Sequence, residues 1–577
     1  MDKPVYLDNA ASAPLDPRLL PLLNEALARP GNPSALHAAG RLLRAEIDDA
    51  RGSVAALIGA APEDIVFTSG ASESNNTAVR GLFAAAAAAA PGRTCRVLIS
   101  PLEHPSAAEA ARLLAAERGA AVDVLPVDRQ GLVSAADVAR LITDDTVLVC
   151  VMWVNNVLGS VQPIAEIGRI VAAARRSRPA GSPPLHFFCD AVQAAAWLPI
   201  DVRAAGVDAL SLSAHKLGGP KGVGALYLRR GAPCEPLLVG GGQEEGRRSG
   251  TENHAGIVAL GAAAALAAKE GPAEAERLRG LRRRLVDGLA ALKGFTVIGP
   301  AGEQAAPHIV YFRSDRFDGE TLVLKLDAAG IAVSSGSACD AGSRKTSSVL
   351  KAVLGDGQAA RGGVRVSFGR TTTEADIERL LRPWRHSDDI LHMKKVFIVH
   401  GFEGSPNGGW RPWLMGELAK HEIYACALSM PSPEAPKLAE WLAEISRHVD
   451  RNAQDELYLV GHSLGVPSIL RYLETAPSAL GLAGAVLVSG PCEPTGNAKL
   501  GEFLDEPFDL AAIKPKLGRC VVVHGDNDPL VPLAQAEKLS RELGAKLVII
   551  KNGGHLNGSS GWYTLPAALD ALLAMAA

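Results

Sequence analysis

Short apolar runs alternate with longer amphipathic stretches along the first two thirds of the chain. The runs at residues 97–100, 147–152 and 209–213 are mostly apolar, and such continuous apolar character is typical of strands buried in a parallel sheet. Alanine, leucine and arginine fill the stretches between them, as in amphipathic helices. Up to about residue 383 this alternation predicts a βαβ architecture, with a helix over 273–292 leading into a smaller domain.

The periodicity stops at residues 385–392, a polar stretch with the sequence RHSDDILH. Directly after it, Met393 and two lysines precede an apolar run that is typical of a buried strand. We therefore predict a flexible linker over 385–392 between two domains, residues 1–384 and residues 393–577. Each domain is long enough to form its own core.

Composition excludes several classes of function. Lys and Arg total 59 against 62 Asp and Glu, a net charge of −3, so we expect neither nucleic acid nor an anionic membrane as a partner. The N-terminal residues lack the apolar core of a signal peptide, and no apolar run reaches membrane-spanning length. The eight cysteines have no Cys-x-x-Cys or other metal-ligand spacing. We expect a cytoplasmic protein with no metal site.

A lysine and an acid in the first domain have the most specific chemistry. Lys216 ends the sequence Ser213-Ala-His-Lys216 ahead of a glycine-rich turn, and Asp190 follows the apolar run 185–188. A cofactor with an aldehyde and a protonated ring nitrogen needs both groups, because the amine binds the aldehyde and the carboxylate holds the pyridinium proton. Either residue alone is more often a solvated surface group.

Further motifs supply other groups that such a cofactor needs. An apolar run, a glycine turn and a helix start follow one another at residues 67–76, where backbone N–H groups and Ser72 are suited to phosphate. Ser213 and His215 add side-chain donors, and the imidazole of His104 is suited to stacking on a planar ring. A serine at a helix start or a lone histidine is, by itself, more often structural.

Together these motifs resemble those of cysteine desulfurases, which are pyridoxal-phosphate enzymes of the class V aminotransferase fold. The resemblance extends over residues 1 to about 383 and implies an α/β fold, with a large, mostly parallel sheet domain and a small α+β domain. It also implies a homodimer that binds pyridoxal 5'-phosphate. The motifs include Tyr6-Leu-Asp-Asn-Ala-Ala, Asn32-Pro-Ser-Ala-Leu-His, Glu103-His104, Asn155-Asn156, Asp190-Ala-Val-Gln193, Ser213-Ala-His-Lys216 and Arg248-Ser-Gly-Thr251.

The resemblance implies a role for each motif residue. Lys216 would bind the cofactor covalently and His104 would stack on its ring, while Asp190 would pair with the ring nitrogen. Gln193 would bind the phenolate oxygen. Arg365 and Asn155 would hold the substrate carboxylate, a task that suits a bidentate guanidinium. The implied cofactor-binding set is Ala71, Ser72, His104, Asn155, Asp190, Gln193, Ser213, His215, Lys216 and, from the second subunit, Thr251.

Cys339 distinguishes between reaction types. It lies in a loop rich in glycine and serine, residues 333–343. In a desulfurase the thiolate attacks the sulfur of bound L-cysteine, keeps that sulfur as a persulfide and leaves alanine, and an acceptor protein then takes the sulfur. The alternatives are a selenocysteine lyase or another enzyme of the class V aminotransferase type.

The second domain has the residue order of α/β-hydrolases. The sequence Gly461-His-Ser463-Leu-Gly465 follows an apolar run and predicts a sharp turn from strand to helix that exposes the serine. Asp526, Asp528 and His555 then stand at the ends of two later apolar runs. A nucleophile, an acid and a histidine in this order predict a compact α/β-hydrolase domain with a Ser–Asp–His triad.

This domain resembles the small serine hydrolases of the YdeN and retinoblastoma-binding-protein group. In that pattern Asp528, followed by Val531 and a proline, would be the triad acid in preference to Asp526. The N–H groups of Phe402 and Leu464 would form the oxyanion hole. The alternative is a non-catalytic module that docks a partner.

Overall fold

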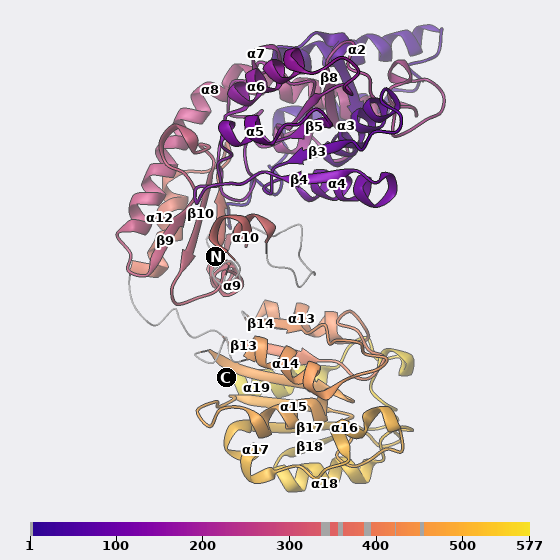
Figure 1. The fold of residues 1–577 in the computed structure, drawn as a ribbon. Coiled ribbons are helices and arrows are strands. Elements are labelled where there is room, and N and C mark those ends of the chain that lie inside the picture. The colour runs from indigo at the N-terminus through magenta and orange to yellow at the C-terminus, as the bar shows by residue number, and fades with distance from the viewer. Residues whose placement is uncertain (1–3, 336–346, 356–361, 386–393, 422, 450–454) are drawn as a thin grey trace. The chain divides into compact units, whose positions relative to one another are not determined.

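The computed structural model describes residues 4–335, 347–355, 362–385, 394–421, 423–449 and 455–577. By the contacts between its residues the chain divides into two compact units, Met1–Arg385 and His386–Ala577 (Figure 1). Each unit has its own sheets and its own hydrophobic core, as expected for a chain that is too long for a single core.

A seven-stranded mixed sheet forms the centre of the first unit. In spatial order its strands are β2 (Ile65–Thr68), β8 (Gly224–Leu228), β7 (Ala209–Ser213), β6 (His186–Asp190), β5 (Thr146–Cys150), β3 (Arg96–Ile99) and β4 (Ala121–Val124). From β4 to β7 neighbouring strands are parallel, whereas β8 is antiparallel to both β7 and β2. Every residue of β5, β6 and β7 is buried, which explains their mostly apolar character.

Helices pack against this sheet through small and aliphatic side chains. Phe83 of α3 (Ala71–Ala88) and Leu114 of α4 (Pro105–Arg118) share one apolar cluster with Val97 and Val147 of the strands. The remaining helices of this region are α1 (Leu20–Ala28), α2 (Ala38–Ile58), α5 (Ala135–Leu141), α6 (Ile164–Ser177) and α7 (Val202–Ala205).

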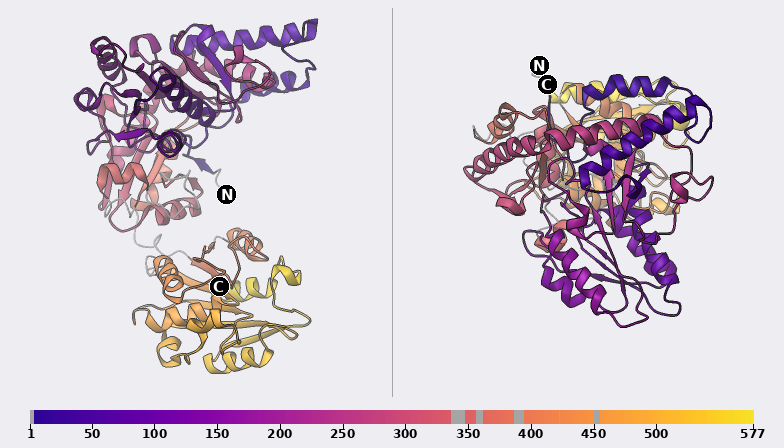
Figure 2. Two further views of the ribbon diagram at one scale, coloured as in Figure 1. Left: turned by 45° about the vertical axis from the view of Figure 1, so that its right-hand side comes forward. Right: turned by 90° about the horizontal axis from the view of Figure 1, so that it is seen from above.

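Helix α8 (His254–Ala290) begins well before the helix predicted over 273–292. Pro272 lies inside it, although proline is more common at a helix start. The helix lies beside α2 (Figure 2), and the two backbones approach closely where a Cβ on Gly261 would stand 2.5 Å from Ala50 Cα. This tertiary contact stabilises the turns before the proline, where sequence alone gave no helix.

A smaller α+β region completes the first unit. Its antiparallel sheet has the order β12 (Val364–Ser367), β10 (Ile309–Ser314) and β9 (Phe295–Ile298), and β1 (Val5–Tyr6) pairs in parallel with β11 (Ile331–Ala332). Its helices are α9 (Gly319–Ala328), α10 (Ser348–Leu354) and α12 (Glu374–Arg385).

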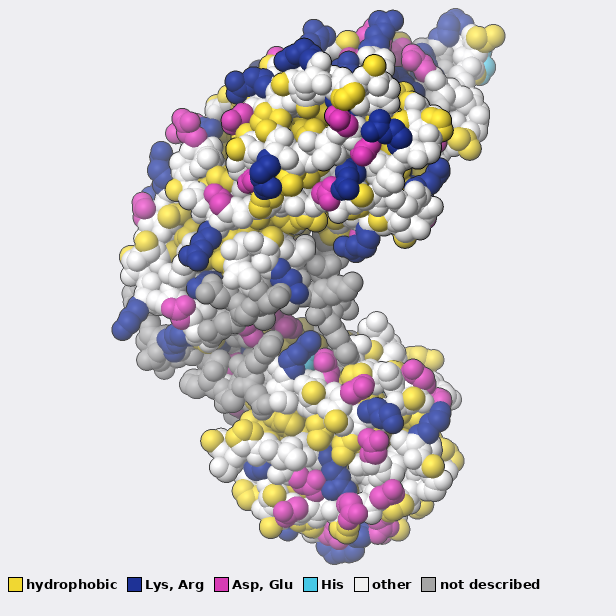
Figure 3. Space-filling model, in the orientation of Figure 1, with side chains coloured by type: hydrophobic (Ala, Val, Ile, Leu, Met, Phe, Trp, Pro, Cys, Tyr) yellow, Lys and Arg dark blue, Asp and Glu magenta, His cyan; other side chains and the backbone are white. Residues whose placement is uncertain are grey.

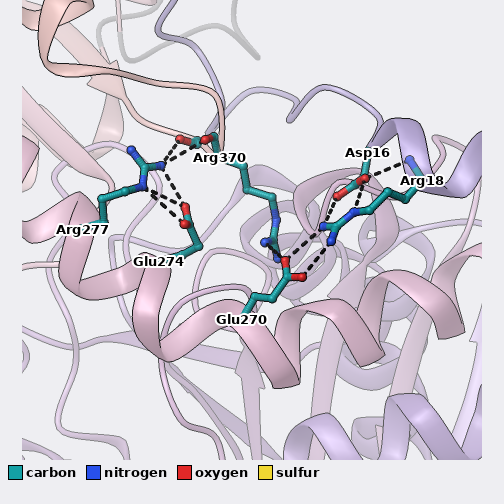
Figure 4. A network of polar contacts seen from close by, with 7 residues as sticks. Asp16, Arg18, Glu270, Glu274, Arg277 and Arg370 are labelled. Atoms are coloured by element: carbon teal, nitrogen blue, oxygen red, sulfur yellow. Dashed lines mark hydrogen bonds and ion pairs between the residues drawn. The ribbon is translucent and has the colours of Figure 1, made fainter.

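An ion-pair network joins α8 to this smaller region (Figure 4). The carboxylate of Glu270, two residues before the proline, binds the guanidinium groups of both Arg18 and Arg370. Arg277 donates a hydrogen bond of 2.6 Å to the backbone oxygen of Thr372. The network therefore fixes the segment that directly follows β12.

The second unit contains a six-stranded parallel sheet. In spatial order its strands are β14 (Tyr424–Ala427), β13 (Lys394–Val399), β15 (Glu456–His462), β16 (Gly484–Val488), β17 (Arg519–Gly525) and β18 (Lys546–Ile550). Alternate residues of β13 enter two apolar clusters, one on each face of the sheet. The predicted α/β fold of both units is confirmed.

The helices of the second unit divide between these clusters. The first cluster includes residues of α14 (Leu438–Val449) and α15 (Gly465–Thr475), and the second includes residues of α13 (Arg411–Lys420) and α19 (Pro566–Ala576). The other helices are α16 (Gly501–Leu504), α17 (Leu510–Leu517) and α18 (Leu533–Leu543).

The surface shown in Figure 3 mixes acidic and basic side chains over each unit, in keeping with the small net charge of −3. None of the described helices combines the length and the apolar character needed to cross a bilayer.

Candidate active sites

A cavity of about 590 Å³ lies at the carboxyl ends of β6 and β7 in the first unit. Ligands of α/β proteins commonly bind at this edge of a sheet. Most of the residues that sequence predicted for the cofactor or substrate line the cavity, namely Ala71, Ser72, His104, Asp190, Gln193, Ser213, His215, Lys216 and Arg365.

The N-terminus of α3 forms one wall of this cavity. Gly70 caps the helix with a φ of 151°, a conformation that favours glycine, and the first N–H groups of any helix have no intrahelical acceptor. Burial and the charges of Lys216 and Lys221 lower the pKa of His215 to about 4. The imidazole is therefore neutral at pH 7 and can donate a hydrogen bond to a phosphate without adding charge.

Lys216 lies in the turn η3 (Ala214–Lys216), which directly follows β7. Its Nζ donates hydrogen bonds to the backbone oxygens of Ala10 and Ala11, the second at 2.6 Å. Gln193 Nε2 donates to the same Ala10 oxygen at 2.9 Å. The amine and the amide that sequence predicted for the aldehyde and the phenolate oxygen therefore share one acceptor.

Asp190 ends β6 and is 4% exposed. Its Oδ2 accepts a hydrogen bond of 2.9 Å from Asn75 Nδ2, and its Oδ1 accepts one of 3.0 Å from the Val192 N–H. Asn75 Nδ2 also lies 2.8 Å from Ser106 Oγ, which is 2.7 Å from His104 Nδ1. One network thus orients both the carboxylate and the imidazole of the predicted cofactor site.

Glu103 is a buried acid in the same cavity wall. Burial, and to a lesser degree the charge of Asp190, raises the pKa of Glu103 to about 8, although its Oε1 accepts a hydrogen bond of 2.7 Å from the Met152 N–H. At pH 7 the side chain is mostly protonated. Glu103 therefore adds little negative charge beside Asp190.

Arg365 lies in β12 and is 2% exposed. One terminal nitrogen lies 2.8 Å from Asp8 Oδ1, and the other donates a hydrogen bond of 2.9 Å to the backbone oxygen of Asn156. Its Nε is buried and has no hydrogen-bond partner in the described part of the chain. Arg365 lines the cavity, and a guanidinium there is suited to binding a carboxylate ligand.

Asn155 differs from its predicted role. Its side chain is fully buried, with Nδ2 donating to the Leu102 oxygen at 3.1 Å and Oδ1 accepting from the N–H groups of Val157 and Leu158 at 3.0 and 2.8 Å. These bonds use the amide to hold a turn, so it does not line the cavity. The neighbouring Asn156 lines the cavity instead.

Two further predicted residues are not part of this cavity wall as described. Thr251 is exposed and lines a separate pocket of about 120 Å³, so a role at a cofactor site would require a second subunit. Cys339 lies outside the described residues, and its place relative to the cavity stays a prediction.

The cavity wall fits pyridoxal 5'-phosphate. It combines an amine, a buried carboxylate, a neutral imidazole and a helix N-terminus, which match the aldehyde, the ring nitrogen and the phosphate of that group. Asn75 Oδ1 is buried in this wall without a hydrogen-bond partner in the described part of the chain. Among the described residues no cluster of His, Cys, Asp and Glu is arranged to hold a metal ion.

The cysteines that the structure describes are free thiols. Burial raises the pKa of most of them, and for Cys234, Cys492 and Cys520 the pKa rises to about 12, 11 and 12. The pKa values of Cys95, Cys150 and Cys189 are raised as well, again chiefly by burial.

In the second unit Ser463 occupies the sharp turn between β15 and α15. Its φ is 54°, which is strained for a residue with a side chain, and its N–H donates a hydrogen bond of 2.9 Å to the Val488 oxygen. A Cβ on Gly465 would lie 2.1 Å from the Val399 oxygen, and one on Gly461 would lie 2.9 Å from the Gly465 backbone. The turn therefore requires both glycines of the motif.

His555 follows β18 and contacts Asp528, which was predicted as the triad acid in preference to Asp526. Its Nδ1 lies 2.8 Å from Asp528 Oδ2, while the N–H groups of Leu530 and Val531 bind Oδ1 at 2.9 and 3.0 Å. Burial alone would raise the pKa of Asp528, but the hydrogen bonds from His555 and Val531 outweigh it, and the pKa is lowered. The carboxylate is therefore ionised and can hold the Nδ1 hydrogen of the imidazole.

Asp526, the alternative acid, has a different partner. Its Oδ1 accepts a hydrogen bond of 2.7 Å from the Asn552 N–H at the surface. Ser463 Oγ makes no hydrogen bond to the residues described, and contacts between nucleophile and base are often long before substrate binds.

Comparison with known proteins agrees with this geometry. Residues 5–380 match the family model "Aminotransferase class-V", and residues 396–574 match the model "Serine hydrolase". The chain belongs to the class V aminotransferase family. Its C-terminal unit is a serine hydrolase domain, so the predicted fusion of two such units is confirmed.

The similar proteins with curated names are cysteine desulfurases. Cysteine desulfurase IscS of Dictyoglomus turgidum is 38% identical over 385 residues, which are 66% of this chain and 93% of the relative. The IscS-like cysteine desulfurase of Mycobacterium tuberculosis is 39% identical over 379 residues, 65% of this chain and 94% of the relative.

Solved structures resemble the class V aminotransferase unit. A NifS-like protein has a TM-score of 0.60 at 34% identity and covers 66% of this chain and 98% of its own. The structure of SspA in complex with cysteine has a TM-score of 0.54 at 32% identity and covers 63% of this chain and 98% of its own.

The serine hydrolase unit also contains two histidines whose contacts sequence analysis did not anticipate. His462, inside the Gly-His-Ser-Leu-Gly motif, is buried and donates through Nε2 to the backbone oxygen of His555 at 3.0 Å. Two indole N–H groups bind the same loop, Trp410 to the Leu556 oxygen at 2.8 Å and Trp562 to an oxygen two residues before His555 at 2.7 Å. Three aromatic donors thus hold the backbone of the loop that contains His555.

The second of these histidines, His400, holds the predicted oxyanion hole. Its Nδ1 donates to the Gly401 oxygen at 2.9 Å, and the Gly404 N–H donates to the same oxygen at 3.0 Å. Because a peptide unit is planar and trans, fixing this carbonyl also fixes the direction of the Phe402 N–H. Within the described residues neither this N–H nor that of Leu464 has an acceptor, so both remain able to bind an oxyanion.

Proposed function

We propose that the class V aminotransferase unit is a cysteine desulfurase that uses pyridoxal 5'-phosphate to convert L-cysteine into L-alanine and a protein persulfide. The observation that carries this proposal is the cavity in which Lys216, Asp190, Gln193 and Arg365 meet. The names of the relatives, which are cysteine desulfurases, support L-cysteine as the substrate.

The residues of this chain would divide the work between binding, proton transfer and sulfur transfer. When bound, pyridoxal 5'-phosphate supplies an electron sink for the substrate α-carbon. Arg365 binds the substrate carboxylate, and the Lys216 amine moves the proton at the α-carbon. The Cys339 thiolate attacks the substrate sulfur, and the bond between that sulfur and the substrate β-carbon breaks. The β-carbon takes up a proton, so the product that leaves is alanine.

Alanine and the persulfide can be measured on the same sample. Purified protein with pyridoxal 5'-phosphate and ³⁵S-labelled L-cysteine should form alanine and carry the label on Cys339, as peptide mass spectrometry identifies. Lys216→Ala should form no alanine, whereas Lys221→Ala, the matched control beyond the glycine turn, should retain most activity. Cys339→Ser should bind cofactor and substrate but retain no sulfur.

Two results would oppose this assignment. Substantial alanine formation by Lys216→Ala would remove the basis for the first unit's chemistry. Label found on another cysteine of the wild type would exclude Cys339 as the nucleophile, and alanine formed without any retained sulfur would favour a selenocysteine lyase or another aminotransferase-type enzyme.

We further infer that the unit acts as a cytoplasmic homodimer that passes sulfur to an acceptor protein. Three consecutive apolar side chains, those of Leu237 (41%), Leu238 (41%) and Val239 (82%), are exposed and support a subunit interface, since contiguous exposed apolar groups commonly mark an interaction site. The position of Thr251 outside the cavity supports a role in the partner subunit's site. Reduced, unpaired cysteines support a cytoplasmic location. Light scattering of the purified protein tests the dimer.

For the C-terminal unit we propose hydrolysis of an ester or amide by Ser463, Asp528 and His555. The observation that carries it is the strained turn at Ser463 together with the contact between His555 and Asp528. The N–H groups of Phe402 and Leu464 add to it, because they have no acceptor among the described residues. A fluorophosphonate probe should label the wild type at Ser463, and Ser463→Ala should lose both labelling and hydrolysis of p-nitrophenyl acetate.

Alanine formation by Ser463→Ala should stay within twofold of the wild type, because each unit contains a complete catalytic set. An unlabelled wild type would favour the alternative of a non-catalytic docking module.

A further inference from the structure

A buried histidine of the smaller region reaches the wall of the desulfurase cavity. His308 precedes β10 and is 2% exposed. Its Nε2 lies 3.2 Å from Gln193 Oε1, and its ring packs on Trp197 with a centroid distance of 5.8 Å. Gln193 lines the cavity and Trp197 follows it four residues later. His308 therefore contacts the segment that presents Gln193.

The surrounding groups define where the hydrogen of this imidazole lies. Burial, followed by the charges of Arg365 and Lys216, lowers the pKa of His308 to about 3, so the ring is neutral at pH 7 and has a single N–H. Its Nδ1 has no hydrogen-bond partner in the described part of the chain. Gln193 uses its amide nitrogen on the Ala10 oxygen at 2.9 Å, which leaves its oxygen as an acceptor. The hydrogen therefore belongs on Nε2.

We propose that His308 is a positioning residue that selects one of the two orientations of the Gln193 carboxamide. By binding the amide oxygen, His308 directs the NH₂ group toward Ala10 and the amine of Lys216. In the reverse orientation two acceptors would face each other at Ala10, and the cavity would present a carbonyl where a donor is needed. The inference rests on the proposed function, in which Gln193 donates to the phenolate oxygen of pyridoxal 5'-phosphate.

Three variants separate this role from simple packing. His308→Phe keeps a ring against Trp197 but removes the N–H donor. His308→Gln restores a donor at a similar reach. His186→Phe is the matched control, because His186 is also buried (3% exposed) but lies in β6 outside the cavity wall.

The cofactor's visible absorbance gives the first measurement. In the wild-type holoenzyme its pH midpoint reports how well the phenolate oxygen is stabilised. His308→Phe should move this midpoint upward by about half a unit or more and lower kcat about tenfold with KM within twofold, since a phenolate without its donor is harder to keep ionised. His308→Gln should recover kcat to within about threefold of the wild type, and His186→Phe should leave the midpoint unchanged.

A double-mutant cycle tests whether His308 acts through Gln193. In the background of Gln193→Ala, adding His308→Phe should change kcat by less than twofold, because the amide to be positioned is gone. The proposal would be overturned if the losses in kcat of the two single variants were fully multiplicative. It would also be overturned if His308→Phe had the same midpoint and kcat as His186→Phe.

The same cycle on the cofactor-free protein separates this inference from the proposed function. The shifts in Tm caused by His308→Phe and Gln193→Ala should be clearly non-additive if the two side chains bind each other, and additive shifts would overturn the inference. A wild type that bound no pyridoxal 5'-phosphate would instead overturn the proposed function, while the Tm cycle would still decide on the contact.

Discussion

Replacing Asp528 with asparagine should inactivate the serine hydrolase unit by moving a single proton. The N–H groups of Leu530 and Val531 bind Oδ1 of Asp528 at 2.9 and 3.0 Å. In Asp528→Asn the amide oxygen has to stay at this position, so the NH₂ group takes the place of Oδ2, 2.8 Å from His555 Nδ1. There it donates to Nδ1, which forces the imidazole hydrogen onto Nε2. A histidine in this tautomer cannot accept the proton of Ser463.

The expected loss is large because the base is absent while the fold is intact. The same exchange in a serine protease triad lowers kcat by about 10⁴, which corresponds to about 5 kcal/mol of activation free energy. We expect a loss of this order in kcat for p-nitrophenyl acetate, a similar fall in the rate of fluorophosphonate labelling, and a Tm within a few degrees of the wild type.

Asp526→Asn is the matched control. Among the described residues the Asp526 carboxylate accepts a hydrogen bond from the Asn552 N–H alone. An amide oxygen can keep that bond, so the kcat of Asp526→Asn should stay within about threefold of the wild type. The reasoning would be refuted if Asp528→Asn retained a tenth of the wild-type kcat, or if the control lost more activity than Asp528→Asn.

Three further substitutions test other contacts. Arg365→Lys should raise the KM for L-cysteine about tenfold or more, measured by alanine formation, because an ammonium cannot replace a bidentate guanidinium; an unchanged KM would contradict its role. Gly465→Ala should destabilise the hydrolase unit by more than about 3 kcal/mol in thermal unfolding, since its Cβ would lie 2.1 Å from a backbone oxygen, whereas Gly481→Ala has open space and should be tolerated. His400→Phe should lower kcat for p-nitrophenyl acetate about fivefold, the equivalent of one hydrogen bond of about 1 kcal/mol; equal losses in His400→Phe and His400→Asn, which keeps a donor, would contradict that contact.

Strand bounds and site residues can be predicted best from the sequence where local pattern and chemistry coincide. Strand β7 has the predicted bounds of 209–213, because a mostly apolar run ends at the polar turn that contains Lys216. Asp190 ends one strand and Lys216 lies in the turn that follows another, and parallel strands bring their carboxyl ends to one edge of a sheet. That distant motifs meet in one cavity can therefore be predicted without knowing how the side chains pack.

Choices that depend on side-chain direction could not be made in this way. Asn155 and Asn156 are adjacent and chemically identical, and only the bonds of Asn155 to its own turn show that Asn156 lines the cavity. His308 likewise has no signal in its neighbourhood, because its partner Gln193 is 115 positions away. Helix α8 begins before the predicted range because its early turns pack against α2. The sequence pattern does not reveal this start, because a proline lies inside the helix.

Burial of the cysteines limits which thiols of the protein can compete for a persulfide sulfur. A persulfide is lost to whichever thiolate reaches it first, and a thiol that stays protonated is a poor competitor. Burial raises the pKa of Cys95, Cys150, Cys189 and Cys234, and of Cys492 and Cys520 in the hydrolase unit. These thiols therefore stay protonated at neutral pH. A persulfide on Cys339, as proposed above, would therefore meet few competing thiolates among the cysteines that the structure describes.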